Sequence, residues 1–270
     1  MPFNPPRRSR LGGRLLIAGV IAGISLLTYF WNSSKNPVTG ESQRVALSEE
    51  QEVALGLQAR EEMAAQFGGL HRDESAQQVV DRVGQRLVQR SVAARSPYTF
   101  EFHLLADEKT INAFALPGGQ IFITAGLYAR LGSEAQLAGV LGHEIGHVIE
   151  RHGAEHMATA QLTQGLIGSV VAGTGDLSAA QVASMVGQLV NLKYGRDDEL
   201  ESDRWGVRLL ADAGYDPRAL IAVMRVLSEA SGGAGPDFFA SHPNPTNRIG
   251  EIERLIAERY PGGVPDDLEK

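Results

Sequence analysis

The chain has 270 residues, of which 43% are hydrophobic and 21% charged, and its formal net charge is −7. This composition is typical of a globular protein, and the length suits one main domain. The chain has no cysteine, which excludes thiolate metal ligands, disulfides and a lipid-modified N-terminal cysteine. The acidic balance argues against nucleic acid as a partner.

The N-terminal 31 residues are typical of a membrane-directed segment. Residues 1–14 hold four arginines and no acidic residue, and the 17 residues from 15 to 31 carry no charge. That length lies between a signal-peptide core and a full span. Since the run ends in aromatic residues without a small-x-small cleavage signal, we expect an uncleaved signal anchor, with a cleaved signal peptide as the alternative. The arginines place the body on the extracytoplasmic or periplasmic side of the cell membrane, or free there if the segment is cleaved.

A polar stretch and two helices follow this segment. Residues 32–44 show no periodic apolar pattern and are expected to form a tether before the main domain, residues 45–262. Ser48 and Gln51 form a capping box that opens a helix to about residue 67, and a second helix is expected over residues 74–90. Both are interpreted as scaffold.

Two β units come next. From Tyr98 to Leu104 apolar and polar residues alternate, which indicates a half-buried strand with His103 on its polar face as a surface residue. A second unit spans residues 112–124 and is interrupted by Pro117, which is tolerated at a sheet edge. Its first part can add an extended peptide as a further strand, although an ordinary hairpin is the alternative. The residues of this expected substrate-binding edge strand are Asn112, Ala113, Phe114, Ala115 and Leu116.

A helix beginning after Ser133 carries the strongest chemical signal. His143 and His147 are four residues apart, so they share one helix face with Cβ atoms about 5–6 Å apart and can hold one tetrahedral Zn²⁺. Glu144 is turned away by about 100°, which suits a general base that takes a proton from a water on that cation. The alternative is a surface helix with two unrelated histidines.

The next stretch, residues 155–193, is nearly uncharged and contains several glycines. We expect a helical hairpin beside or over the metal site, with a membrane-dipping segment at residues 157–192 as the alternative. His152 and His156 are also four residues apart, but Gly153 argues against them as a competing metal pair.

Downstream, a helix is expected up to Gly214, which is placed to end it. Glu199 and Asp203 share one face of this helix. Glu199 can be the third metal ligand, and Asp203 can accept the free ring N–H of a ligand histidine. Glu201 is the rival ligand but faces elsewhere, and a solvated acidic helix start is the alternative.

The C-terminal part contains His242, which follows a glycine-rich segment and precedes Pro243. We expect His242 within reach of the metal, either as a fourth ligand that displaces the water or as a donor to the oxyanion. A structural role near the last helix, expected from about residue 246 to 259, is the alternative. Residues 263–270 are expected to be a disordered tail.

Four separated motifs then suggest a family. They are Asn112–Gly119, His143–His147, Glu199–Asp203 and Ser241–Ile249, and Asn36–Gly40 adds a fifth similarity. Together they resemble family 48 of the metallopeptidases, the gluzincins of the HtpX, CAAX prenyl protease, Oma and BepA–LoiP type. The resemblance implies an α+β, mainly helical, zincin-like domain with a small sheet whose edge strand lines the active-site cleft. It also implies cleavage of misfolded or misassembled envelope proteins.

The sequence therefore predicts a membrane-anchored zinc endopeptidase with one Zn²⁺ per chain and polypeptide substrates bound in an extended conformation. Zinc would be held by His143, His147 and Glu199, with Glu144 as catalytic base. Two alternatives stay open: a non-catalytic chaperone or assembly factor that uses the same cleft, and a latent protease that needs activation.

Overall fold

The computed structural model describes residues 20, 23–24, 26–31, 33–45, 47–167, 193–230, 237–243 and 247–270. Most of the expected N-terminal anchor, the second part of the expected helical hairpin and the glycine-rich segment before His242 lie outside these residues. Among the helices that the structure describes, none combines the length and the apolar character needed to cross a bilayer.

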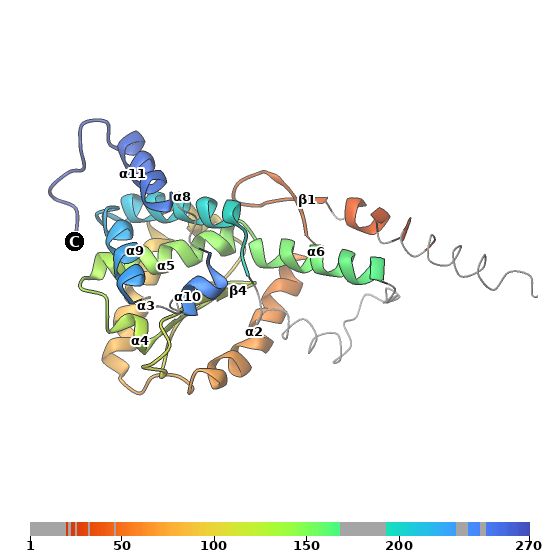
Figure 1. Cartoon of the computed structure of the whole chain (residues 1–270), viewed down its shortest axis with the longest axis horizontal. Coiled ribbons are helices and arrows are strands. Elements are labelled where there is room, and N and C mark those ends of the chain that lie inside the picture. The colour runs from red at the N-terminus through yellow and green to blue at the C-terminus, as the bar shows by residue number, and fades with distance from the viewer. Residues whose placement is uncertain are drawn as a thin grey trace, which may run out of the picture.

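Helix α5 (Glu134–Ile149) lies in the middle of the molecule, and Figure 1 shows α8 (Arg196–Ala213) running alongside it. Ser133 caps α5 by accepting the N–H of Gln136, and the helix begins after Ser133 as the sequence predicts. Gly146 lets the two helices approach closely, because a Cβ there would lie 3.0 Å from the Cα of Ser202. This close packing brings the side chains of α8 onto the face of α5 that carries the histidines.

The sheet has three strands in the order β3-β5-β4. Strands β3 (Glu101–Leu105) and β5 (Gln120–Thr124) are parallel, and β4 (Ala113–Leu116) pairs antiparallel with β5 at the edge. His103 is half-buried and not a plain surface residue, because it bonds to Gln120 (2.8 Å) and packs on a phenylalanine ring of β5.

The register of β4 determines which of its backbone groups are free. The N–H of Thr124 bonds to the carbonyl of Asn112, which makes these two residues a hydrogen-bonded pair. Hydrogen-bonded pairs alternate along an antiparallel ladder, so Phe114 and Leu116 bond to β5 while Ala113 and Ala115 direct their N–H and C=O outward. The edge strand predicted from the sequence thus turns the backbone groups of Ala113 and Ala115 away from β5, and both residues are buried.

The remaining helices surround this core, which confirms the predicted mainly helical α+β class. Helix α2 begins at the predicted capping box of Ser48 and Gln51, and α3 begins at the cap Asp73. The bounds of the outer helices are α2 (Glu49–Gln66), α3 (Glu74–Gln89), η1 (Val92–Arg95), α4 (Ala125–Tyr128), α6 (His152–Ile167), α9 (Ala219–Ala230), α10 (Asp237–Ser241) and α11 (Arg248–Arg259).

The segment expected to be a tether is instead a docked hairpin. Strands β1 (Ser33–Lys35) and β2 (Ser42–Arg44) pair antiparallel. The buried Asn36 donates to the carbonyl of Ile149 (2.7 Å), and Gln43 donates to that of Glu150. These amides satisfy carbonyls at the end of α5 that have no partner within the helix, which explains why this polar stretch is ordered.

The expected C-terminal tail also differs from the prediction. Residues 263–270 run back along the turn after α8, where Glu269 accepts the N–H of Asp216 (2.8 Å) and donates to the carbonyl of Gly214 (3.0 Å). Its side chain forms an ion pair with Arg86. Backbone bonds and an ion pair thus fix a segment whose composition alone predicts disorder.

Candidate metal centre

Helices α5 and α8 and the end of α10 bring four side chains together. His143, His147, Glu199 and His242 are all buried, and one ligand atom of each lies within 4.8 Å of the others. The Nε2 atoms of both α5 histidines are 3.5 Å from the oxygens of Glu199. Imidazoles and a carboxylate in this arrangement are the donor set of a catalytic zinc site.

Unpaired polar atoms show that the site suits a polar occupant. In the part of the chain that the structure describes, both carboxylate oxygens of Glu144 and Nε2 of His242 are buried without a hydrogen-bond partner. Leaving such an atom unpaired costs about 1–3 kcal/mol. Glu144 Oε1 and His242 Nε2 are 3.7 Å apart, so the unpaired carboxylate faces a member of the four-residue cluster. The residues therefore fit a zinc site.

The protonation states of the cluster follow from burial and neighbours. Burial lowers the pKa of His147 well below its usual value, which favours the neutral imidazole that metals require. Burial acts the same way on His143, but hydrogen bonds to Asp203 and Glu199 outweigh it and raise the pKa of His143 to about 9. Burial also raises the pKa of Glu144. A cation would therefore displace a proton from His143 on binding.

Asp203 lies behind His143, where the sequence analysis expected it. Its Oδ1 is 3.0 Å from Nδ1 of His143, on the side of the ring away from Glu199. A carboxylate in this position fixes the proton on Nδ1 and leaves Nε2 free for a metal.

Arg248 belongs to the motif Ser241–Ile249, but the sequence assigns it no role. It is buried at the start of α11 and donates to Asp203 through Nε (2.7 Å) and Nη2 (2.6 Å), and to Glu199 through Nη1 (2.8 Å). A cation in the first turn of a helix opposes the helix dipole. An arginine at this unfavourable position is a signal in the sequence that its side chain pairs with carboxylates from another element.

His242 occupies a defined position within the cluster. Its ring stacks on Phe238 with centroids 4.3 Å apart, and its Nδ1 is 3.0 Å from Glu199 Oε1. Its other ring nitrogen faces Glu144. The geometry is therefore compatible with the two metal-site roles that the sequence analysis considered.

The second histidine pair does not assemble as a metal site among the described residues. His156 bonds to Asp198 at 2.6 Å, whereas His152 contacts Glu201 at 3.2 Å and Nδ1 of His147 at 2.9 Å. Glu201, the rival third ligand, thus lies beyond His152 and outside the four-residue cluster.

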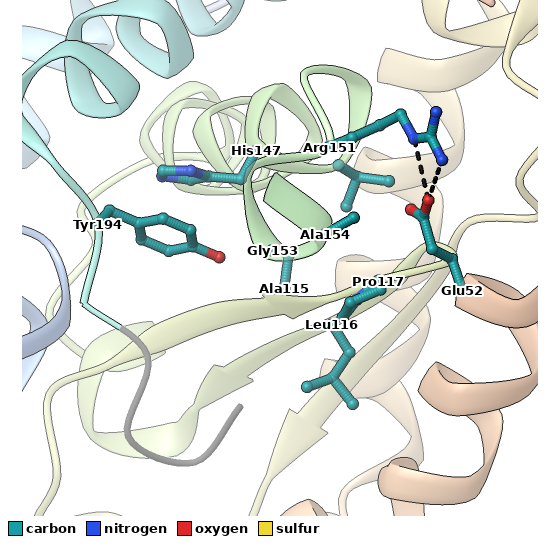
Figure 2. A pocket seen from close by; sticks show the side chains of 10 residues that line it. Glu52, Ala115, Leu116, Pro117, His147, Arg151, Gly153, Ala154 and Tyr194 are labelled. Carbon is teal, nitrogen blue, oxygen red and sulfur yellow. Dashed lines mark hydrogen bonds and ion pairs between the residues drawn. The ribbon is translucent and has the colours of Figure 1, made fainter. Parts of the chain in front are cut away.

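A small cavity of about 10 Å³ joins the edge strand to the cluster. Figure 2 shows Ala115, Leu116 and Pro117 on one side of it and His147 with Tyr194 on the other. The ring of Tyr194 stacks on that of His147 with centroids 3.8 Å apart. The cavity has room for about one water, and it places the outer edge of β4 next to a candidate metal ligand.

Known proteins resemble this chain over the same elements. The model of peptidase family M48 matches residues 74–256. The β-barrel assembly-enhancing protease of Yersinia pestis is 32% identical over 83% of this chain and 48% of that protein. The protein of the same name from Escherichia coli K12 is 28% identical over 91% and 52%. The mitochondrial metalloendopeptidase OMA1 of Schizosaccharomyces pombe is 29% identical over 95% and 75%.

The chain spans about half the length of the assembly-enhancing proteases that it matches. The family match runs from α3 to α11 and includes the edge strand, both α5 histidines, Glu199, His242 and Arg248. It confirms the resemblance found in the sequence: the chain belongs to peptidase family M48.

Proposed function

We propose that this protein is a zinc endopeptidase in which His143, His147 and Glu199 hold the metal and Glu144 is the catalytic base. The observation that carries the proposal is the buried cluster of ligand atoms within 4.8 Å of one another, next to a carboxylate, Glu144, that has no hydrogen-bond partner in the described part of the chain. A binding protein has no need of this costly unpaired carboxylate, which argues against a purely non-catalytic chaperone or assembly factor.

The residues divide the chemistry among them. Zinc, when bound, would polarise the scissile carbonyl and make water easier to deprotonate. Glu144 takes the proton of the attacking water and passes it to the leaving amine. Burial raises its pKa above the usual carboxyl value, and a group that must both accept and release a proton works best when its pKa lies near the working pH. Asp203 and Arg248 keep His143 and Glu199 oriented throughout.

We also propose that the substrate is a polypeptide in an extended conformation, paired with the outer edge of β4. Two observations support this mode of binding. Ala113 and Ala115 direct their backbone donors and acceptors away from β5, and Ala115 lines the cavity that His147 also lines. A peptide added to this edge would pass close to the metal ligands.

His242 supports a latent form of the enzyme as a second candidate. Its Nε2 has no hydrogen-bond partner among the described residues and faces Glu144. An imidazole that fills the position of the attacking water would silence the enzyme until the end of α10 moves. The alternative role is donation of a hydrogen bond to the oxyanion.

For the biological role we propose cleavage of misfolded or misassembled envelope proteins by an extracytoplasmic domain, residues 45–262 with the hairpin, anchored through residues 1–31. The names of the relatives, a β-barrel assembly-enhancing protease and a mitochondrial metalloendopeptidase, support a protease of this kind. The uncharged run of residues 15–31 supports the anchor.

The test is cleavage of unfolded casein by the purified full chain, with and without a chelator and with metal analysis. Glu144→Gln should keep the zinc and lose turnover, whereas Glu199→Ala should lose the zinc. Glu253→Gln, an exposed residue of α11, is the control and should behave as the wild type. Full turnover by the Glu144→Gln variant would refute the assigned mechanism.

A further inference from the structure

The two ring nitrogens of His147 have different partners. Nε2 faces the cluster, 3.5 Å from Glu199 Oε1. Nδ1 faces away from it and lies 2.9 Å from Nδ1 of His152, a fully buried residue at the start of α6. The other nitrogen of His152, Nε2, is 3.2 Å from Glu201 Oε2. The three side chains therefore form a continuous chain of polar contacts that ends at a carboxylate.

We propose that His152 and Glu201 are positioning residues that fix the tautomer and orientation of His147 through this relay. The inference rests on the proposed function only in taking His147 as a zinc ligand. A neutral imidazole that binds a cation through Nε2 carries its proton on Nδ1. His147 then donates to Nδ1 of His152, whose own proton must be on Nε2, where Glu201 accepts it.

His143, the other ligand histidine on α5, also has a carboxylate behind its Nδ1, but without a bridging histidine. Nδ1 of His143 contacts a carboxylate directly, at 3.0 Å from Asp203. Carboxylates that accept the free N–H of a ligand histidine raise its basicity and hold its ring in place. His147 has no carboxylate at this distance on its Nδ1 side among the described contacts, and His152 bridges the gap to Glu201.

The backbone is shaped to make this contact. On an uninterrupted helix, five residues turn the chain by about 500°, so His152 would point about 140° away from His147. The chain instead breaks between α5 and α6 at Arg151, whose φ of 58° is the only positive value of a non-glycine residue among those described. That left-handed conformation is unfavourable for any residue with a Cβ.

Buried contacts hold Arg151 in this conformation. Figure 2 shows its side chain reaching away from His147 toward Glu52, which accepts from Nε at 2.9 Å, and Nη2 also donates to the carbonyl of Leu47. The docked hairpin bonds to the same turn through Asn36 and Gln43. A strained backbone conformation that is held by several buried contacts often serves a function. Here the conformation of Arg151 determines the direction in which His152 points.

The test is the zinc dissociation constant of the full chain, measured by competition with a chelating indicator. His152→Ala should weaken zinc binding about 10–100-fold, the usual effect of removing a partner behind a ligand histidine. His152→Asn should keep most of the affinity, because its amide oxygen lies near the place of Nδ1. His152→Gln should lose zinc affinity, because its amide lies near the place of Nε2 and not of Nδ1.

Two further variants separate the relay from packing. Glu201→Ala changes a side chain that is 41% exposed, so it should fold normally, as unfolding of the metal-free protein would verify, and still weaken zinc binding. Glu253→Gln, which changes an exposed residue of α11, is the control. It should leave the affinity unchanged.

The relay is refuted if Glu201→Ala and His152→Ala bind zinc as tightly as the wild type, or if the Asn and Gln variants are weakened equally. These outcomes differ from a failure of the proposed function. A wild-type protein that binds zinc but cleaves no casein would refute the peptidase, whereas the affinity differences among the variants would still support the relay.

Discussion

Replacing Arg248 with methionine is expected to destabilise the metal-free protein strongly. The guanidinium is buried and pairs with two carboxylates that are also fully buried, Asp203 and Glu199. Methionine keeps part of the apolar stem but leaves both carboxylates without their cation. Removing one partner of a buried ion pair costs about 3–5 kcal/mol, because the remaining charge is uncompensated.

The effect can be measured by thermal or urea unfolding of the chelator-treated protein. For a domain of this size each kcal/mol lowers the melting temperature by about 2–4 °C, so we expect a loss of about 6–20 °C. The melting temperature of Arg248→Lys should lie between those of the wild type and Arg248→Met, because lysine keeps the charge but not the planar guanidinium that binds both oxygens of Asp203. Zinc should restore part of the stability, since the cation compensates Glu199.

Two comparisons determine whether the reasoning holds. Arg254→Met removes an exposed arginine of the same helix that pairs with Glu251 and Glu258, and it should change stability little. Adding Asp203→Asn to the Arg248→Met variant should cost less than the sum of the single changes, by about 0.5–3 kcal/mol. A loss below about 1 kcal/mol for Arg248→Met, or strict additivity, would refute the view that the pairing of buried charges sets the cost.

Three further predictions follow from the site and its surroundings. Ala115→Pro removes an outward N–H but no bond to β5, so it should raise KM or abolish casein cleavage while zinc stays bound; unchanged kinetics would place the substrate elsewhere. The His242→Ala variant distinguishes three roles. Higher casein turnover would identify His242 as an inhibitory ligand, and turnover lower by about a hundredfold with zinc retained would identify it as an oxyanion donor. Unchanged turnover would indicate a structural role. Burial opposes the ionisation of Asp216, but hydrogen bonds from Arg218 outweigh it and hold its pKa below 3.8. The stabilisation that it provides is therefore complete above 3.8 and lost as the pH falls through its folded pKa, so urea unfolding of Asp216→Asn should differ from the wild type at pH 7 and converge with it in acid.

The sequence alone determined the parts of the site that depend on one helix. Spacing by four residues places His143 with His147, and Glu199 with Asp203, on common faces whatever the rest of the chain does. The cap Ser133 and the glycine Gly214, with its φ of 82°, fix where α5 begins and α8 ends. These are local consequences of helical geometry, and they were sufficient to predict the metal-binding chemistry.

Only the tertiary structure decided the contacts between segments far apart in the chain. Arg248 meets Asp203 across 45 residues, and Arg151 meets Glu52 across 99. His152 reaches His147 only because that second pair holds a left-handed turn, which no helical pattern predicts. The docked hairpin and the ordered C-terminal residues depend in the same way on backbone groups presented by distant helix ends. Periodicity describes the neighbours of a residue within its own element, whereas the pairing of buried charges and free backbone groups is determined when the elements pack.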